Sequence, residues 1–184
     1  MNLSRLIPTS TLIGCTSLPR PGGNPRVPAA QTVYQATGGF EAFLTLAEAW
    51  HRRVVTDEVV GHAFRKGVHP EHTRRLAAYW AESLGGPRLY SESVGDGSSV
   101  IRMHSGNGEH EEMNRRAIAC FDGAPEDAGL DADERLRSTL HDYFVWATAE
   151  MTRYPHSAQD VPAGLKVPAC SWDCRLLTDF SHPE

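Results

Sequence analysis

The sequence predicts an all-α domain, and three observations support this prediction. Apolar residues recur with the helical period across residues 33–154, where strand-like alternation of polar and apolar residues is scarce. Clusters of glycine and proline separate the periodic segments, as expected for breaks between helices. The 184 residues, of which 40% are hydrophobic, are enough to build one domain with its own core.

The first two predicted helices each place a histidine on the buried face. One helix begins after Gly38 and Gly39, and its apolar stripe consists of Phe40, Phe43, Leu44, Ala47, His51 and Val54. The next helix is expected from Pro70 to Leu84, where the sequence Gly-Gly-Pro ends it. Its inner stripe consists of His72, Leu76, Tyr79, Trp80 and Ser83.

A polar segment and two further helices complete the predicted domain. Residues 91–107 contain too many serines and glycines for a long helix, and His104 lies within this segment. A third helix is expected after the Asn-Gly turn at 107–108. The fourth is expected to begin at the capping-box pattern Asp-Ala-Asp-Glu at 131–134.

The two flanking segments are predicted to lie outside this domain. Residues 1–32 contain five prolines and no hydrophobic period, which indicates an extended, disordered leader. Residues 155–184 are again proline-rich and are expected to form either a strap over the domain or a tail. Cys170 and Cys174 have the loose spacing of a zinc half-site, but no second close pair follows them. Free thiols in a reducing cytoplasm are therefore the preferred interpretation.

Charge and hydropathy argue against two classes of function. The net charge of −5 provides no basic surface for phosphates, which disfavours nucleic-acid binding. No apolar run approaches the roughly 18 residues that a bilayer crossing needs, which disfavours membrane insertion. The nine histidines are the anomalous feature of the composition and direct attention to imidazole chemistry.

Three of these histidines, His51, His72 and His104, fall on separate elements, and several interpretations of them are open. Backbone carbonyls often satisfy a buried neutral histidine, and a ring left without partners costs about 1–3 kcal/mol. A bare zinc or iron site with three histidines is a second interpretation. A di-iron site needs two Glu-x-x-His pairs, and only Glu48 with His51 has that spacing. Haem iron fits best, because the surrounding stripes are apolar.

Four ordered sequence blocks then carry a resemblance to a known family. They are YQATGGF at 34–40, TDEVV at 56–60, GGPRLYSE at 85–92 and RMH at 102–104. In this order and setting the chain resembles the truncated haemoglobins, group II in particular, over about residues 33–154. The resemblance implies a two-over-two helical sandwich with haem b between the helices.

The resemblance also implies roles for individual residues. His104 matches the proximal ligand of the haem iron, presented by an irregular loop. The residues expected to contact the haem are Phe64, Leu76, Tyr79, Arg88, Tyr90 and Met103.

Departures from the family pattern concentrate around the opposite, distal face. His51 stands where the family usually has a tyrosine that bonds the diatomic ligand, and His72 occupies the gate position of the distal helix. Ala117 stands where group II members supply an indole N–H. Asn107 and Gly108 replace the apolar and proline residues that commonly follow the proximal histidine. The polar contacts to a ligand are therefore expected from two imidazoles.

Three functions follow from this pattern. The first is a haem protein that binds O2, and by the same chemistry NO or CO, with the distal histidines donating N–H groups or with one of them coordinating iron. The second is a haem oxidoreductase acting on peroxide or NO, in which His51 and His72 transfer protons and a reductase supplies electrons. The third is a globin-like shell that has lost haem and serves as an interaction domain.

Overall fold

The computed structural model describes residues 31–173, and no β-strand lies within this range. Among the described helices, none is both long and apolar enough to cross a bilayer. The elements in chain order are α1 (Val33–Thr37), α2 (Phe40–Thr56), the 3-10 helix η1 (Val60–Phe64), α3 (His72–Ser83), α4 (Leu89–Ser93), α5 (Gly97–His104), α6 (Glu111–Asp127), α7 (Glu134–Met151) and the 3-10 helix η2 (Ala158–Asp160). The all-α prediction is confirmed. Almost all of the predicted leader, residues 1–30, lies outside the described residues, as does Cys174.

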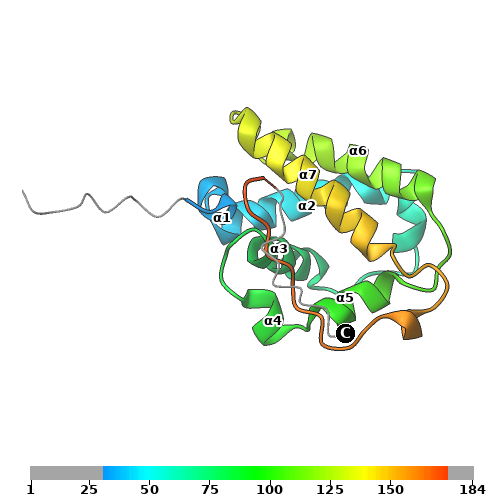
Figure 1. Ribbon diagram of the computed structural model, residues 1–184. Helices are drawn as coiled ribbons and strands as arrows, with labels where there is room; N and C mark the ends of the chain where they lie inside the picture. The colour runs from blue at the N-terminus through cyan, green and yellow to red at the C-terminus, as the bar shows by residue number, and fades with distance from the viewer. Residues whose placement is uncertain (1–30, 174–184) are drawn as a thin grey trace, which may run out of the picture. The chain divides into compact units, whose positions relative to one another are not determined.

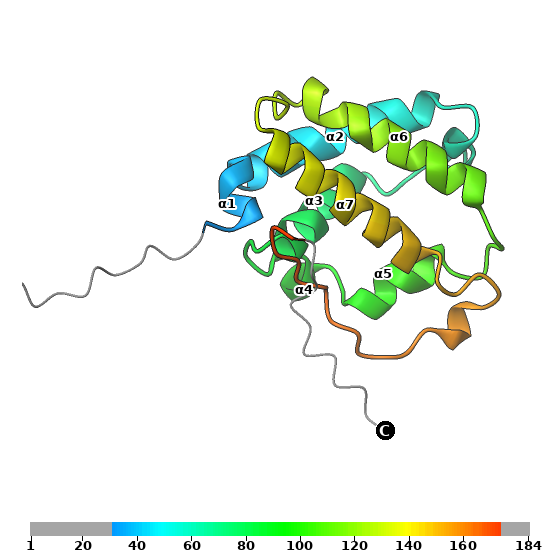
Figure 2. The ribbon, with the colours of Figure 1, turned by 45° about the horizontal axis from the view of Figure 1, so that its top comes forward.

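Two pairs of helices, α2 with α3 and α6 with α7, form the core of the fold (Figure 1). α2 contacts both α3 and α6, and α6 runs beside α7 in both views (Figure 2). Trp80 meets Phe121 edge to face with ring centroids 5.3 Å apart, and Phe121 stacks on Phe144 at 4.0 Å. Trp50 completes this aromatic cluster from α2, 5.8 Å from Trp80. The predicted two-over-two sandwich is confirmed.

The short helix α1 precedes the first predicted helix and is an addition to the predicted elements. Its start is a capping box, in which the Thr32 hydroxyl accepts the backbone N–H of Gln35 and the Gln35 side chain accepts that of Thr32. Gly38 ends the helix at φ 108°, a left-handed conformation that favours glycine. The Tyr34 N–H then donates to the Leu84 carbonyl at 2.9 Å, which ties α1 to the end of α3.

Two helices begin two or three residues later than the sequence predicts. α3 starts at His72 rather than Pro70, because the His72 N–H donates to the His69 carbonyl at 2.8 Å in a turn that occupies the expected first residues. α7 starts after Asp133 rather than Asp131. The Asp133 carboxylate accepts two first-turn N–H groups, at 2.9 and 3.1 Å, and so provides the cap.

The segment that carries His104 is more regular than predicted. The polar stretch 91–107 contains no long helix, as expected, but it forms most of α4 and all of α5. Asp96 caps α5 by accepting the Ser99 N–H at 2.8 Å. His104 is the last residue of α5, so the expected irregular loop before it is wrong. An aspartate cap followed by helix-compatible serines explains the difference, since serine is tolerated within a short capped helix.

Residues 155–173, which we term the C-terminal strap, lie against the helices. The strap, coloured orange to red in Figure 1, passes α5 and α4 and then reaches α3 and α7. The Cys170 N–H donates to the Ser83 carbonyl at 2.7 Å, and the Trp172 indole N–H donates to the Gln31 carbonyl at 2.6 Å. The guanidinium of Arg135 on α7 covers the Trp172 ring, 4.4 Å from its centroid. The far end of the strap is therefore held by α3, by α7 and by Gln31, which precedes α1.

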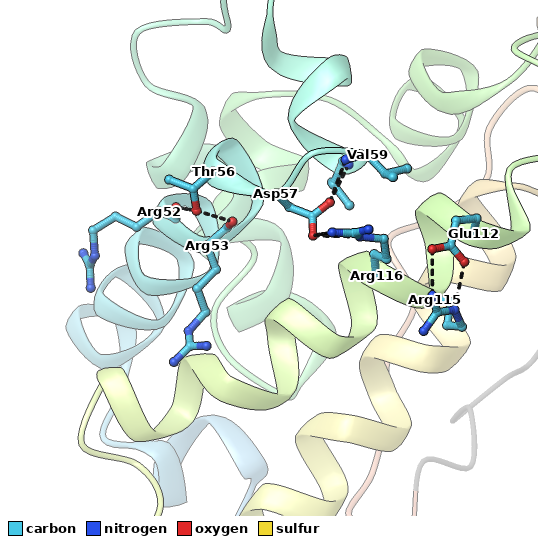
Figure 3. Close-up of polar contacts among 9 residues, drawn as sticks. Arg52, Arg53, Thr56, Asp57, Val59, Glu112, Arg115 and Arg116 are labelled. Atoms are coloured by element: carbon cyan, nitrogen blue, oxygen red, sulfur yellow. Dashed lines mark hydrogen bonds and ion pairs between the residues drawn. The ribbon is translucent and has the colours of Figure 1, made fainter.

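Asp57 fixes the junction between α2, η1 and α6 (Figure 3). One carboxylate oxygen accepts the backbone N–H groups of Val59 and Val60, each at 2.9 Å, and the other accepts Nε of Arg116 on α6 at 2.8 Å. The Val60 N–H and then the Arg116 guanidinium lower the pKa of Asp57. This junction sets the position of η1, which carries Phe64.

Replacing Asp57 with alanine should lower the melting temperature by several degrees, since it removes the acceptor of the Val59 and Val60 N–H groups and the partner of Arg116 together. Because the folded-state pKa of Asp57 is lowered, its contribution is present above about pH 4 and is lost as the pH falls through the folded pKa. Thermal melts of wild type and variant should therefore converge in acid. Glu112→Ala, which breaks only the exposed helical pair with Arg115, is the control. Equal melting temperatures at pH 7 for Asp57→Ala and wild type would contradict the assignment.

Candidate functional site

Three aromatic rings from three elements meet at one end of the helical sandwich. His51 comes from α2, Phe64 from η1 and His72 from α3. The ring centroids of His51 and His72 lie 5.2 Å apart, and Phe64 stands edge to face with both, at 5.2 Å and 5.8 Å. The structure thus brings together the two histidines and the phenylalanine that the sequence predicts for the site.

Each of these histidines has a buried ring nitrogen without a hydrogen-bond partner among the described residues. The two atoms are Nδ1 of His51 and Nε2 of His72. An unsatisfied polar atom of this kind costs about 1–3 kcal/mol, so a fold that keeps two of them side by side needs a compensating partner. The arrangement does not fit the simplest interpretation, in which backbone carbonyls satisfy each histidine.

Burial keeps both imidazoles neutral at neutral pH. It lowers the pKa of His51, and it is also the main cause of the lowered pKa of His72. The charges of His51, His104 and then His69 lower the pKa of His72 further. His104 on α5 is therefore near enough to His72 to act on it electrostatically.

His104 has a defined tautomer set by its own helix. Its Nδ1 lies 2.8 Å from the carbonyl oxygen of Val100, one turn earlier in α5. A carbonyl only accepts, so Nδ1 carries the proton and Nε2 of the neutral ring keeps the lone pair. The side chain is exposed, whereas His51 and His72 are half-buried. His104 thus offers an oriented, accessible nitrogen ligand, with the hydrogen bond to its second nitrogen that metal-bound histidines commonly have.

A bare metal ion finds no matching ligand set in the part of the chain that the structure describes. No three histidine, cysteine, aspartate or glutamate side chains within residues 31–173 are grouped closely enough to hold one. The three-histidine and di-iron interpretations therefore lack their ligands there. An iron that brings its own four equatorial nitrogens requires only one protein ligand.

The other residues predicted to contact haem occupy varied environments. Leu76 is half-buried on α3. Tyr79 and Tyr90 are each 5% exposed and pack edge to face at 5.1 Å, and burial raises the pKa of both phenols. Arg88 is exposed and its Nε donates to the Ser91 hydroxyl, while Met103 is 68% exposed. Their assignment to haem contacts stays a prediction.

Arg75 is a residue that the sequence analysis did not select. It follows His72 by three positions on α3, so both lie on the same side of the helix. Its Nε is buried and has no hydrogen-bond partner among the described residues, and its charge acts on Tyr90. The signal available in the sequence was the position one turn after an inward histidine, which is an unusual place for an arginine.

Trp50 occupies the region of Ala117, where the sequence analysis noted a missing indole. Its Nε1–H donates to the Ala117 carbonyl at 3.2 Å, and only 9% of the residue is exposed. The indole of Trp50 therefore packs against α6, but its N–H is already used by the backbone. The indole N–H of Trp50 is therefore not available to a ligand, unlike Nδ1 of His51 and Nε2 of His72, which have no partner among the described residues.

The paired imidazoles should make stability depend on pH. Because the folded-state pKa values of His51 and His72 lie below the ordinary value of 6.5, the unfolded chain takes up protons first as the pH falls. The melting temperature of the haem-free protein should therefore decrease as the pH falls below about 6.5. His72→Phe should flatten this decrease, whereas His62→Phe, at an exposed position, should keep it. Identical profiles for the wild type and His72→Phe would contradict this prediction.

The chain is similar to known globins in both sequence and structure. It matches the family model of bacterial-like globins over residues 32–148. A haemoglobin from the actinobacterium Thermobifida fusca is 30% identical, with a TM-score of 0.55 and coverage of 65% of this chain and 95% of that one. The group II truncated haemoglobin of Bacillus anthracis is 20% identical, with a TM-score of 0.60 and coverage of 69% and 95%. The truncated oxygen-avid haemoglobin of Bacillus subtilis is 22% identical, with a TM-score of 0.55 and coverage of 66% and 98%. A search of curated protein sequences finds no match.

The family match contains the whole of the candidate site. Residues 32–148 include α1 to α6 and most of α7, and therefore hold His51, Phe64, His72 and His104. The match ends before the C-terminal strap. This chain belongs to the bacterial-like globin family, and its fold is that of the truncated haemoglobins.

Proposed function

We propose that this chain binds haem b through Nε2 of His104 and binds O2, NO or CO on the opposite face, beside His51 and His72. The observation that carries the proposal is the set of imidazole nitrogens left available on three elements. Nε2 of His104 keeps its lone pair, and the buried Nδ1 of His51 and Nε2 of His72 have no partner among the described residues. A flat ligand between α5 and the distal helices would give all three atoms a role.

The side chains present fit a haem in several respects. Phe64 and the half-buried Leu76 offer apolar surface, and the hydrogen bond to Val100 orients His104. When bound, haem supplies an iron that takes one protein nitrogen and has a sixth position for a diatomic ligand. Membership of the globin family and the likeness to haemoglobins support the same cofactor.

The distal imidazoles act as neutral donors in this proposal. Both pKa values are lowered, so at pH 7 each ring has one N–H and one unprotonated nitrogen. A ring rotated to present its N–H stabilises the partial negative charge of a polar diatomic ligand, and O2 gains more from this than CO. Phe64, edge to face with both rings, limits their alternative orientations.

Arg75 is proposed to hold a haem propionate, because a buried guanidinium nitrogen without a partner is suited to a carboxylate. Arg75→Leu should therefore lose haem to an acceptor globin about tenfold faster than wild type, as expected for one lost charge-assisted bond. Its neighbour Arg74, exposed and stacked over Phe40, provides the matched control Arg74→Leu. Equal rates of haem loss in both variants would contradict the assignment.

The proposal is tested by adding haem to the purified chain and recording absorption spectra. We expect a Soret band that saturates at one haem per chain, a ferrous form that shifts on adding CO, and an oxygenated form that is stable in air. A chain that gives no Soret band after haem addition would contradict the proposal and support a haem-free interaction domain.

A haem-dependent oxidoreductase acting on peroxide or NO is the second candidate. The observation that favours it is that His51 and His72 each keep an unprotonated nitrogen, which can accept a proton and return it. Such an enzyme would need a reductase as partner. Rapid oxidation of the ferrous protein in air, together with peroxide-dependent turnover that requires His51 or His72, would select it. We place either activity in the cytoplasm, where a thiol such as that of Cys120 stays reduced.

A further inference from the structure

The helix that carries His104 has little support from the four-helix core. Among the described helices, α5 contacts mainly η2, the 3-10 helix of the C-terminal strap, and, of the core helices, only α7 to a comparable extent. Its eight residues form less than three turns, too short to be stable without tertiary contacts. Other interactions must therefore determine where α5 lies.

The strap supplies these interactions along one side of α5. Ser98, which is fully buried, donates its hydroxyl to the Pro162 carbonyl at 2.7 Å and accepts the Leu165 N–H at 2.9 Å. The Gly97 N–H donates to the Leu165 carbonyl at 2.8 Å. One turn later, the Arg102 guanidinium donates to the Val161 carbonyl at 3.0 Å. Three successive points on this side of the helix are thus bonded to the strap.

Two further bonds hold the end of α5 just beyond His104. The Gly106 N–H donates to the Tyr154 carbonyl at 3.0 Å, and the Gly108 N–H donates to the Pro155 carbonyl at 2.9 Å. His104 is therefore bracketed in sequence by bonds to the strap before it and by bonds to the strap's first residue, Pro155, and the adjoining Tyr154 after it. Figure 2 shows the orange segment running beside α5 and beside the chain that comes directly after α5.

Gly97 permits the strap to lie this close. A Cβ atom at this position would overlap the carbonyl oxygen of Lys166 and come within 2.9 Å of that of Leu165. The backbones of α5 and the strap are therefore in direct contact, with no room for a side chain. The strap follows the region of family similarity, which ends at residue 148.

We propose that the C-terminal strap sets the position of the proximal ligand, with Ser98 as the main positioning residue. This inference rests on the proposed haem binding through His104. Val100 and His104 lie one turn apart on one side of α5, and Ser98 and Arg102 lie on a different side. The strap therefore binds the side of the helix that faces away from the imidazole and leaves the His104 ring uncovered. The strap thereby fixes the height and rotation of Nε2 relative to the distal helices, and with them the strength of its bond to iron.

The test compares Ser98→Ala with Ser93→Ala in the full chain. Ser93 is exposed, and its hydroxyl bonds only the Leu89 carbonyl within α4, so the same atom is removed without touching the strap. In the haem-free protein, amide exchange in α5 should become about tenfold faster in Ser98→Ala and stay unchanged in Ser93→Ala. In the haem-loaded protein, Ser98→Ala should show about tenfold faster haem loss and a shifted iron–histidine stretching frequency.

Arg102→Leu provides a second variant in case Ser98→Ala does not fold. Arg102 is exposed, so this substitution removes its hydrogen bond to the Val161 carbonyl without opening a cavity. It should change amide exchange and the stretching frequency in the same direction by a smaller factor. The proposal would be overturned if whichever variant folds shows amide exchange in α5 at the wild-type rate and an unchanged iron–histidine stretching frequency. If wild type binds no haem at all, the proposed function fails instead, and faster exchange in α5 would still show that the strap holds this helix.

Discussion

His104→Gly is expected to lose most of its haem during gel filtration and to lack the spectrum of a histidine-bound iron. The physical reason is that His104 supplies an imidazole nitrogen on the α5 side that is oriented by its hydrogen bond to the Val100 carbonyl. Of the single changes considered for this chain, it should have the largest effect on the cofactor. Absorption spectra in the ferric, ferrous and CO-bound states measure it.

Added imidazole distinguishes loss of a ligand from loss of the fold. Glycine at position 104 leaves space for a free imidazole, so millimolar imidazole should restore much of the Soret band. His62→Gly, at an exposed position in η1, should bind haem as wild type does. A His104→Gly protein with wild-type spectra and haem retention would show that another residue binds the iron.

The second large effect is expected on O2 release. His51→Phe and His72→Phe should each raise the O2 dissociation rate constant by about tenfold, because each removes an N–H donor to a polarised ligand. The CO dissociation rate constant should change much less, since CO carries less negative charge. Stopped-flow displacement of O2 by CO measures the first rate, and displacement of CO by NO measures the second.

The pair also makes a prediction about coupling. The two rings lie 5.2 Å apart and share Phe64, so replacing one should alter the orientation of the other. The double variant should therefore deviate from the product of the two single effects. His62→Phe is again the control. Unchanged O2 rates in both single variants would remove the distal-donor role, and a six-coordinate ferrous spectrum lost only in one variant would identify that histidine as an iron ligand.

The helical pattern of the sequence was enough to predict the all-α class and both inward histidines, whereas the sandwich was implied by the resemblance to the truncated haemoglobins. The stripe through His51 and the stripe through His72 each follow the helical period, and the structure places both rings beside Phe64. The hydrophobic period and the composition say little about short helices, and for this reason the sequence predicted an irregular loop where the structure has α5. Its regularity depends on the Asp96 cap and on bonds to a segment 59 to 67 residues further along the chain.

Arg75 and Trp50 illustrate what the sequence did not reveal. The importance of Arg75 comes from a buried nitrogen that has no partner within residues 31–173, a property of packing rather than of residue type. Trp50 follows the expected core pattern, but the use of its N–H by the Ala117 carbonyl depends on how closely α2 approaches α6. Both properties depend on the distances between helices, and these distances cannot be read from the spacing of residues in the sequence.

The bond from the Trp172 indole to the Gln31 carbonyl bears on how this protein should be trimmed for laboratory work. A recombinant fragment cut at residue 148, where the family similarity ends, would keep every histidine of the site and still omit all of residues 155–173. A fragment that keeps the contacts of the strap must therefore extend at least to Trp172. If haem binds as proposed, fragments cut to the length of the shorter relatives should hold it less tightly than the full chain does.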